Sequence, residues 1–410
     1  TPIAFDHLTV EEGLSLSTVY TTLQDQNGLI WIGTRYGLNR YDGYECRVFL
    51  PIKGDKTSLA GPTVIALAED KKGKIWIGHR DAGISVWDKT KGIFEQFPNK
   101  PDSEIDWNKI TVRSIHEDSR GWLWVGTAGA GVFVFDENRN KIEHLCIQCQ
   151  PRTKALKTNF IFDFQEDRQG RIWIAANGRG ITVYDPVSRS TTFINSDDAL
   201  NLNSYEKSLC LDLQGNLWIG TAGSGLYKYD MAGKKFEHFF TDKNNSQQGL
   251  SHNIITDIAV DSSGLLWIAT DGGGLNIHAP GSKIFQHITA SSGHPQSLNT
   301  NALYHLMFDR TGNLWISTFN GGINIHKAFK SPFLIHENQN DYGRKGLRSV
   351  LALKEDVHGK IWMGTDGGGL FFTDTKKHSI KIQAVTIAGK KFPKPVITCI
   401  ETDGEDGLWL

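Results

Sequence analysis

The chain has 410 residues, and 44 Lys and Arg against 45 Asp and Glu give it a formal net charge of −1 at pH 7. This balance, with no basic block, argues against nucleic acid as a partner. No apolar run approaches the roughly 18 residues of a membrane span, and no signal peptide is visible.

One stretch of sequence, from Val19 to Phe49, is typical of four short strands separated by turns. Residues 19–25 are extended and rich in apolar side chains. Residues 29–34 form a short apolar run, as expected of a strand covered on both faces. Residues 38–42 and 45–49 follow as a third and a fourth strand. Asp25 and Gly28 suit the first turn, because Asp bonds its own backbone and Gly adopts positive φ.

The same unit recurs along the whole chain. A Trp in the second strand repeats every 45 to 49 residues, and an Asp precedes it by six positions each time. A fixed period of this length, with several short strands in each, predicts the blades of a β-propeller. The nine tryptophans are Trp31, Trp76, Trp124, Trp173, Trp218, Trp267, Trp315, Trp362 and Trp409.

We interpret these repeated residues as structural. Each indole is expected to fill the space between neighbouring sheets. Each Asp-x-x-Gly is expected to form a turn, because it lacks the alternating acidic ligands and terminal Glu of an EF-hand calcium loop. Cys146 and Cys149 form a C-x-x-C whose redox, metal-binding or disulfide role stays open, although no second pair completes a zinc site. We therefore expect no catalytic residue, no metal site and no cofactor.

The N-terminus is expected to close a ring. Residues from Phe5 resemble the fourth strands that begin at Phe236 and Phe285. We predict an all-β fold in which residues 1–330 form a seven-bladed β-propeller of four-stranded antiparallel blades. Residues 3–8 would complete its last blade, which leaves no bare sheet edge. Residues 331–410, with an outer-strand pattern at 332–337, would begin a second, truncated propeller. An eight-bladed ring is the alternative.

The two ends of the sequence suggest a piece of a longer protein. The chain begins at Thr1 without Met, as expected of a processed or engineered start. It ends at Leu410 in the middle of a blade pattern.

The repeat resembles the two-component-regulator propeller repeat, whose pattern is close to V..I..D..G.LWIGT..GGL...D....F..Y. The opening residues Phe5, Leu8, Gly13, Leu14, Ser15 and Val19 also resemble the start of periplasmic sensor regions in hybrid two-component system proteins. In that family two seven-bladed propellers precede an immunoglobulin-like domain, a membrane helix and a histidine kinase. The resemblance implies a periplasmic part of an inner-membrane protein, which senses polysaccharide-derived oligosaccharides and signals to a kinase outside this sequence.

A ligand is expected on the face where the second-to-third turns and the fourth-to-first connections emerge. Aromatic faces and Asn or Asp acceptors suit a sugar, and Arg35, Arg80 and Arg179 suit uronate or sulfate groups. The candidate ligand-binding residues are Arg35, Tyr36, His79, Arg80, Asp81, Trp107, Asn177, Arg179, Tyr205, Asp271, Phe319 and Asn320, with Asn159, His252, Asn301 and Asp366 at comparable positions. A site between two propellers or at a homodimer interface stays open.

Three other functions compete with a sensor. A propeller lyase or glycosidase needs a convergent acid–base pair, and the 14 histidines are scattered. A protein-interaction scaffold predicts an exposed apolar or aromatic patch on the ring. A quinone-cofactor dehydrogenase is also built on Trp-bearing blades.

Overall fold

The computed structural model describes residues 3–98, 105–149, 155–177, 180–194, 206–241, 249–282, 284–328, 349–374, 379–383, 385–387, 390–392, 396–403 and 407–410. The chain divides into two compact units, Thr1–Phe329 and Lys330–Leu410. No helix in the described residues is long and apolar enough to cross a membrane.

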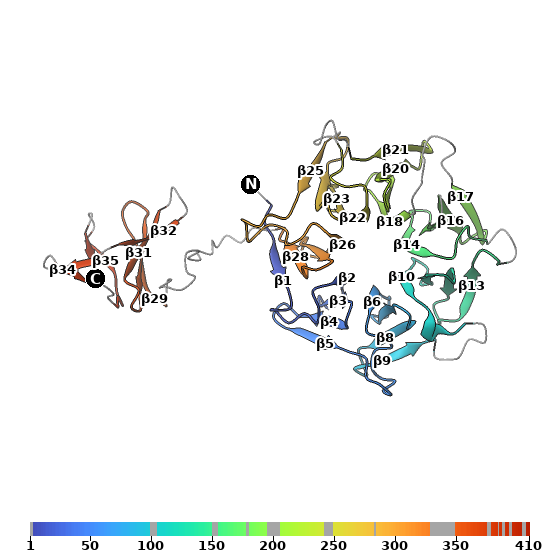
Figure 1. The fold of residues 1–410 in the computed structure, drawn as a ribbon, viewed down its shortest axis with the longest axis horizontal. Coiled ribbons are helices and arrows are strands. Elements are labelled where there is room, and N and C mark those ends of the chain that lie inside the picture. The colour runs from blue at the N-terminus through green and yellow to red at the C-terminus, as the bar shows by residue number, and fades with distance from the viewer. Residues whose placement is uncertain are drawn as a thin grey trace. The chain divides into compact units, whose positions relative to one another are not determined.

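The first unit is a ring of seven four-stranded antiparallel sheets, which confirms the predicted fold class and excludes eight blades (Figure 1). From the centre outwards, blade 1 holds β2 (Val19–Gln24), β3 (Ile30–Thr34), β4 (Leu38–Tyr41) and β5 (Cys46–Phe49). Blade 2 holds β6 (Val64–Glu69), β7 (Ile75–His79), β8 (Ile84–Asp88) and β9 (Ile93–Phe97). Blade 3 holds β10 (Val112–Glu117), β11 (Leu123–Thr127), β12 (Val132–Phe135) and β13 (Lys141–Leu145). Blade 4 holds β14 (Ile161–Glu166), β15 (Ile172–Ala176), β16 (Ile181–Asp185) and β17 (Ser190–Ile194).

The remaining three blades repeat this order. Blade 5 holds β18 (Glu206–Leu211), β19 (Leu217–Thr221), β20 (Leu226–Asp230) and β21 (Lys235–Phe239). Blade 6 holds β22 (Ile255–Val260), β23 (Leu266–Thr270), β24 (Leu275–His278) and β25 (Phe285–Ile288). Blade 7 holds β26 (Leu303–Phe308), β27 (Leu314–Thr318), β28 (Ile323–His326) and β1 (Asp6–Leu8). A 3-10 turn, η1 (Trp107–Lys109), precedes β10.

The core of the ring lies between adjacent blades. Every residue of the second strand of each blade is buried, as in β3 and β11. These strands are covered on both faces by neighbouring sheets, so their sequences are continuously apolar rather than alternating. The outer strand β5 holds no buried residue, because it lies at the rim of the ring and meets solvent.

Each repeated Trp is joined to its Asp by a hydrogen bond. Trp31 donates its indole N–H to Oδ2 of Asp25 at 3.0 Å, and the same bond recurs in the other six blades at 2.8–3.1 Å. The second oxygen of Asp25 accepts the backbone N–H groups of Asn27 and Leu29. One carboxylate therefore fixes both the turn and the indole, and the seven repeated tryptophans of the ring, at most 6% exposed, are core residues as predicted.

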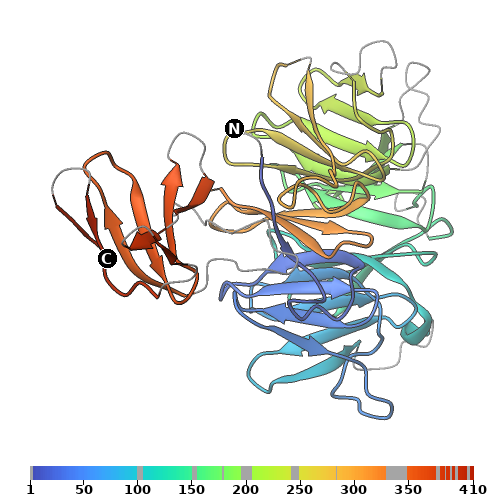
Figure 2. The same cartoon turned by 60° about the vertical axis from the view of Figure 1, so that its left-hand side comes forward.

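The N-terminal segment supplies the outermost strand of blade 7 (Figure 2). Asp6, His7 and Leu8 pair with Ile325, Asn324 and Ile323 in antiparallel register. Phe5 and Leu8 are only 2% and 3% exposed. The first and last strands of the ring therefore share one sheet.

Removing residues 1–8 should destabilise the ring, because it uncovers the edge of β28 and takes two buried apolar side chains from the core. Burial of that kind contributes about 1.5–3 kcal/mol for each side chain. We expect a lower midpoint of urea unfolding and concentration-dependent association through the bare edge. Size-exclusion chromatography across a concentration series measures the second effect. An unchanged midpoint would contradict this account of closure.

The second unit contains one further four-stranded sheet, formed by β29 (Val350–Glu355), β30 (Ile361–Thr365), β31 (Leu370–Asp374) and β32 (Ser379–Gln383). Trp362 bonds Asp356 at 2.8 Å, as in the ring. Two short hairpins follow, β33 (Val385–Ile387) with β34 (Lys390–Phe392), and β35 (Glu401–Thr402) with β36 (Leu408–Trp409). The segment 332–337 lies outside the described residues.

Candidate functional site

A β-bulge at the start of each innermost strand sets the shape of the ring's centre. In β2 the register with β3 shifts between Val19 and Thr21, so Tyr20 is an extra residue. The six other innermost strands carry the same bulge. Bulges turn a side chain out of the regular alternation and are common beside functional sites. The extra residues are Tyr20, Ile65, Arg113, Phe162, Lys207, Thr256 and Tyr304.

All seven extra residues line one cavity of about 230 Å³. The innermost strands that carry them surround the axis of the ring (Figure 1). Each bulge lies at the first residues of its strand, so it is near the face where the second-to-third turns emerge. We call this opening the channel mouth, meaning the seven extra residues and the adjoining turn residues Arg80, Asp271 and Phe319.

Aromatic rings form one side of the channel mouth. The ring centres of Tyr20 and Tyr304 lie 5.3 Å apart, and Phe319 follows at 5.9 Å from Tyr304. The guanidinium of Arg80 lies 5.5 Å from the ring centre of Tyr20. Burial, and then the neighbouring Tyr20, raises the pKa of Tyr304, so its hydroxyl stays protonated and able to donate. This side offers flat apolar faces with polar edges.

Cations form the other side. Arg113 lies 5.0 Å over the ring of Phe162. Partial desolvation inside the ring, and then the positive charge of Arg80, lowers the pKa of Arg113. Desolvation also lowers the pKa of Lys207, with Arg113 adding to the effect and Asp271 opposing it. Arg113 and Lys207 line the cavity and Arg80 lies close enough to repel Arg113, whereas the side chains of Asp163 and Asp257 line the same cavity one residue farther along their strands. The cations favour an anionic group at the mouth itself.

The structure brings three of the predicted site residues to the channel mouth, namely Arg80, Asp271 and Phe319. Arg35, Tyr36, Asn177 and Asn320 are exposed at the second-to-third turns of the same face. Asp366 is exposed in the second unit. Arg179 and Tyr205 lie outside the described residues.

His79 is a correction to the predicted site. It is fully buried, and its Nε2 lies 2.9 Å from the Ser85 hydroxyl. Its place in the repeat, three residues after the Trp, is held in blade 1 by Thr34, whose hydroxyl bonds the Gly37 carbonyl. Desolvation lowers the pKa of His79 to about 4, so it is neutral at physiological pH. His79 therefore belongs to the core, where no ligand reaches it.

Trp107 and Asp81 are also explained by the fold. Trp107 is 7% exposed and packs against Phe133 and Phe135, so it is a core residue rather than a sugar platform. Asp81 adopts φ 56° in its turn and accepts a hydrogen bond from the Thr111 hydroxyl.

Three predicted site residues of the fourth-to-first connections use their side chains to accept backbone N–H groups of the same connections. Asn159 accepts the backbone N–H of Ile147, Asn301 accepts that of Ala290, and His252 Nδ1 accepts that of Ile254.

The extra residues of the bulges are not among the site residues predicted from the sequence. They lie inside strands, for which the sequence predicted only a structural role; these residues are Tyr20, Arg113, Phe162, Lys207 and Tyr304. One signal was present. The second residue of each first strand varies among Tyr, Ile, Arg, Phe, Lys and Thr, while the residue before it is Val, Ile or Leu in six of the seven blades. A variable position inside a repeated strand indicates a side chain that leaves the core.

Below the channel mouth, side chains of the innermost strands join neighbouring blades. Asp163 of blade 4 accepts the backbone N–H of Leu209 of blade 5 at 2.9 Å. Asp257 of blade 6 accepts the Ser208 hydroxyl of blade 5 and the backbone N–H of Leu306 of blade 7, both at 2.8 Å. These carboxylates hold the inner wall of the ring together.

The pH dependence of stability should change in Asp163→Asn. Burial raises the pKa of Asp163 to about 7 from 3.8, against the opposing Leu209 amide. The folded chain then keeps a proton that the unfolded chain releases, so this contribution is complete below pH 4 and lost as pH rises through 7. Because Asn does not titrate, the free energy of unfolding of the variant should rise relative to that of the wild type between pH 4 and 7. The expected rise is on the order of 1 kcal/mol after solvent screening. Urea unfolding at several pH values measures the difference; a constant difference would contradict the raised pKa.

Cys146 and Cys149 form a disulfide, one of the three roles that the sequence left open. The bond closes a turn in which Cys149 donates its N–H to the Cys146 carbonyl, and Ile147 is held by Asn159. His144 stacks on Phe133 beside this turn. The disulfide therefore fixes the loop that follows β13.

The repeats of this chain are similar to those of known proteins. Six segments match the two-component regulator propeller model, at residues 13–36, 58–81, 106–129, 155–178, 249–272 and 297–320. A histidine kinase of Formosa agariphila is 39% identical over 56 residues, which is 14% of this chain and 4% of the kinase.

Solved structures share the fold. Two extracellular domains described as parts of hybrid two-component systems of B. thetaiotaomicron are each 23% identical and cover the whole of this chain. Their TM-scores are 0.69 and 0.64, and this chain covers 52% and 51% of them, about half their length. Virginiamycin B lyase of Staphylococcus aureus is 14% identical with a TM-score of 0.58, covering 80% of this chain and all of the lyase. Six segments of the ring therefore match the two-component regulator propeller repeat, and the solved structures share its fold.

Proposed function

We propose that this chain is an extracytoplasmic ligand-sensing part of a hybrid two-component sensor histidine kinase, located in the periplasm. Two observations support the proposal: six segments match the two-component regulator propeller model, and two similar structures are extracellular domains of hybrid two-component systems. The channel mouth would bind the ligand, and a kinase outside this sequence would receive the signal.

We further propose that the ligand is an oligosaccharide with acidic groups. The observation that carries this proposal is the placement of Arg80, Arg113 and Lys207 beside the rings of Tyr20 and Tyr304 in one small opening. Guanidinium groups bind carboxylate or sulfate in a bidentate way, and aromatic faces stack on sugar C–H groups. Asp271 supplies an acceptor for hydroxyls. Recognition needs both the charge and the rings.

Residues 331–410 are proposed to begin a second propeller. β29 carries the same bulge as the innermost strands of the ring. Val350 and Ile361 are 44% and 41% exposed, whereas the residues at the same repeat positions in blade 1, Val19 and Ile30, are 0% and 5% exposed. In the ring a preceding blade covers these positions. We expect another blade of the same protein to cover them here.

Calorimetry and thermal unfolding with a glycan panel test the function. The 410-residue chain is titrated with acidic oligosaccharides, each beside its desulfated or carboxyl-reduced counterpart. We expect one acidic class to bind, and saturation at a hundred times Kd to add about 2.7 kcal/mol to the free energy of unfolding. Equal binding of both members of every pair would overturn the acidic ligand. Release of new reducing ends during the titration would favour an enzyme, the class to which the lyase structure belongs.

A further inference from the structure

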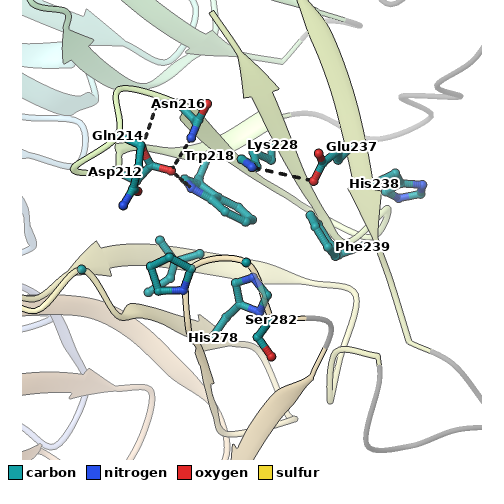
Figure 3. A pocket seen from close by; sticks show the side chains of 14 residues that line it. Asp212, Gln214, Asn216, Trp218, Lys228, Glu237, His238, Phe239, His278 and Ser282 are labelled. Atoms are coloured by element: carbon teal, nitrogen blue, oxygen red, sulfur yellow. Dashed lines mark hydrogen bonds and ion pairs between the residues drawn. The ribbon is translucent and has the colours of Figure 1, made fainter.

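A second recess lies between blades 5 and 6, outside the channel mouth (Figure 3). Its cavity of about 730 Å³ is larger than that at the axis. Trp218, Asp212 and Asn216 of blade 5 line one wall, and His278 of blade 6 meets Trp218 edge-on with ring centres 5.7 Å apart. We call it the blade 5–6 pocket. It lies near the Asp-x-x-Gly turns, whereas the channel mouth lies near the second-to-third turns.

The same place between blades 1 and 2 is filled by the chain itself. Lys89 of blade 2 reaches across to Asp25 of blade 1, with Nζ 3.6 Å from Oδ2, and it bonds Glu69 at 2.9 Å. Asp25 holds Trp31 just as Asp212 holds Trp218. The ammonium of Lys89 therefore neutralises the carboxylate that anchors the indole.

Between blades 2 and 3 an arginine does the same. Arg139 of blade 3 bonds Asp70 of blade 2 at 3.0 Å and Glu117 at 2.7 Å. Its guanidinium also lies 5.1 Å over the ring of Trp76, the indole that Asp70 anchors. Two interfaces of this ring thus place an organic cation on the Asp–Trp pair, one an ammonium and the other a guanidinium.

At the blade 5–6 interface, proline stands where the cation would be. Trp87 and His278 hold the same register, because each pairs with the residue just before the repeated Trp. Lys89 lies two residues after Trp87, and Pro280 lies two residues after His278, so Lys89 and Pro280 occupy the same position in the repeat. The spatial neighbours agree, since a Cβ added at Gly73 would lie 3.6 Å from Lys89 Nζ, and one at the equivalent Gly264 would lie 3.7 Å from Pro280 Cγ. The short ring of proline leaves the space open.

Asp212 keeps only neutral partners in the part of the chain that the structure describes. Its Oδ2 accepts the Trp218 indole N–H and the Asn216 side-chain N–H, at 2.9 and 2.8 Å. It is partly exposed, whereas Asp25 is fully buried. Lys228 lies over Trp218 and pairs with Glu237 at 3.8 Å (Figure 3). Arg40 holds the matching place over Trp31, where Lys89 is present as well. Lys228 therefore does not replace the missing cation.

We propose that the blade 5–6 pocket binds an external organic cation, a guanidinium or alkylammonium group on an apolar chain. The cation would lie against Asp212 and the Trp218 ring, as Arg139 lies against Asp70 and Trp76. Val260 stands at the repeat position of Glu69, one residue before the turn Asp of its blade, and Phe239 and Leu266 add apolar wall. This wall favours an organic cation over a hydrated metal ion. An arginine or lysine side chain of a protein segment and a free alkylguanidine share this chemistry.

Calorimetric titration tests the proposal with two probes, agmatine and a short peptide with one central arginine. Citrulline-containing peptide is the uncharged control. We expect millimolar or tighter binding of the cations and at least tenfold weaker binding of the citrulline peptide. A preference for the peptide assigns the pocket to a protein partner, and a preference for agmatine assigns it to a small molecule. No binding of either cation, or equal binding of the citrulline peptide, would overturn the proposal.

Two variants locate the binding. Asp212→Asn removes the charge and keeps an acceptor for the turn. It should weaken the binding of agmatine and of the arginine peptide at least tenfold. Pro280→Lys introduces the residue that blade 2 has at this position. The new ammonium should occupy the place beside Asp212, so the added cations should no longer bind while the fold is kept. Lys207→Ala at the channel mouth should leave cation binding unchanged. Full binding in Pro280→Lys would place the cation elsewhere and contradict the proposal, whatever the glycan panel shows.

Discussion

Trp124→Ala should lower the free energy of unfolding by about 3–5 kcal/mol, the usual cost of an aromatic cavity in a rigid core. Trp124 is fully buried, and it meets Tyr184 of blade 4 edge-on with ring centres 5.1 Å apart. Its indole N–H bonds Asp118 at 3.1 Å. The cavity cannot collapse easily, because the close packing of Gly126 against Ile161 fixes the distance between blades 3 and 4.

Urea unfolding followed by far-UV circular dichroism measures this loss. Trp124→Phe keeps most of the ring volume and loses the N–H donor, so its midpoint should fall between those of the wild type and the Ala variant. Tyr44, which is 92% exposed, provides the matched control, and Tyr44→Ala should change stability by less than about 0.5 kcal/mol. If Trp124→Ala were as stable as the wild type, the indole would not be the filler between blades that we describe.

Arg113→Glu should reduce the affinity for an acidic oligosaccharide at least a hundredfold, equivalent to about 2.7 kcal/mol or more. The change removes a cation that lies over Phe162 and places a carboxylate in a mouth where the ligand's own anionic group would sit. Loss of the donor and gain of repulsion act in the same direction. Repulsion between Arg80 and Arg113 also ends, so the variant should fold at least as stably as the wild type.

The control makes the same charge change on the outer edge of the ring. Lys235 is exposed on β21, far in topology from the innermost strand, so Lys235→Glu should leave affinity within about twofold. Calorimetry at 50 mM and 300 mM salt separates the two variants further, because an ionic contact weakens as salt screens it. Equal affinity in Arg113→Glu and Lys235→Glu would remove the channel mouth as the acidic site.

The sequence predicted the blades because their determinants are local and repeated. The Asp-x-x-Gly turn, the buried second strand and the Trp lie within a dozen residues, and nine copies fix the period. Ring closure was also predictable, since Phe5 to Leu8 carry the apolar pattern of a fourth strand. A single sheet edge that needs covering leaves few alternatives for such a segment.

The site was only partly predictable, because it depends on which way a side chain points. Arg80 and Phe319 lie in turns and were found from that position alone. His79 is the last residue of β7, directly before such a turn, and its ring takes the place of the Thr34 hydroxyl of blade 1 and points into the core. Arg113 and Lys207 were missed because a bulge turns them into the channel, and only the variation of that position from repeat to repeat marks it in the sequence. The side-chain direction at a strand end depends on the neighbouring blade.

The pairing of β1 with β28 gives the ring a mechanical property. β28 ends at His326, close to the end of the first unit at Phe329. Tension applied to the C-terminal end of β28 would act on its three-residue pairing with β1 and on its four-residue pairing with β27. Because the pairing with β1 is the shorter of the two and joins the two ends of the ring, a pulling experiment on that end should release the N-terminal segment first.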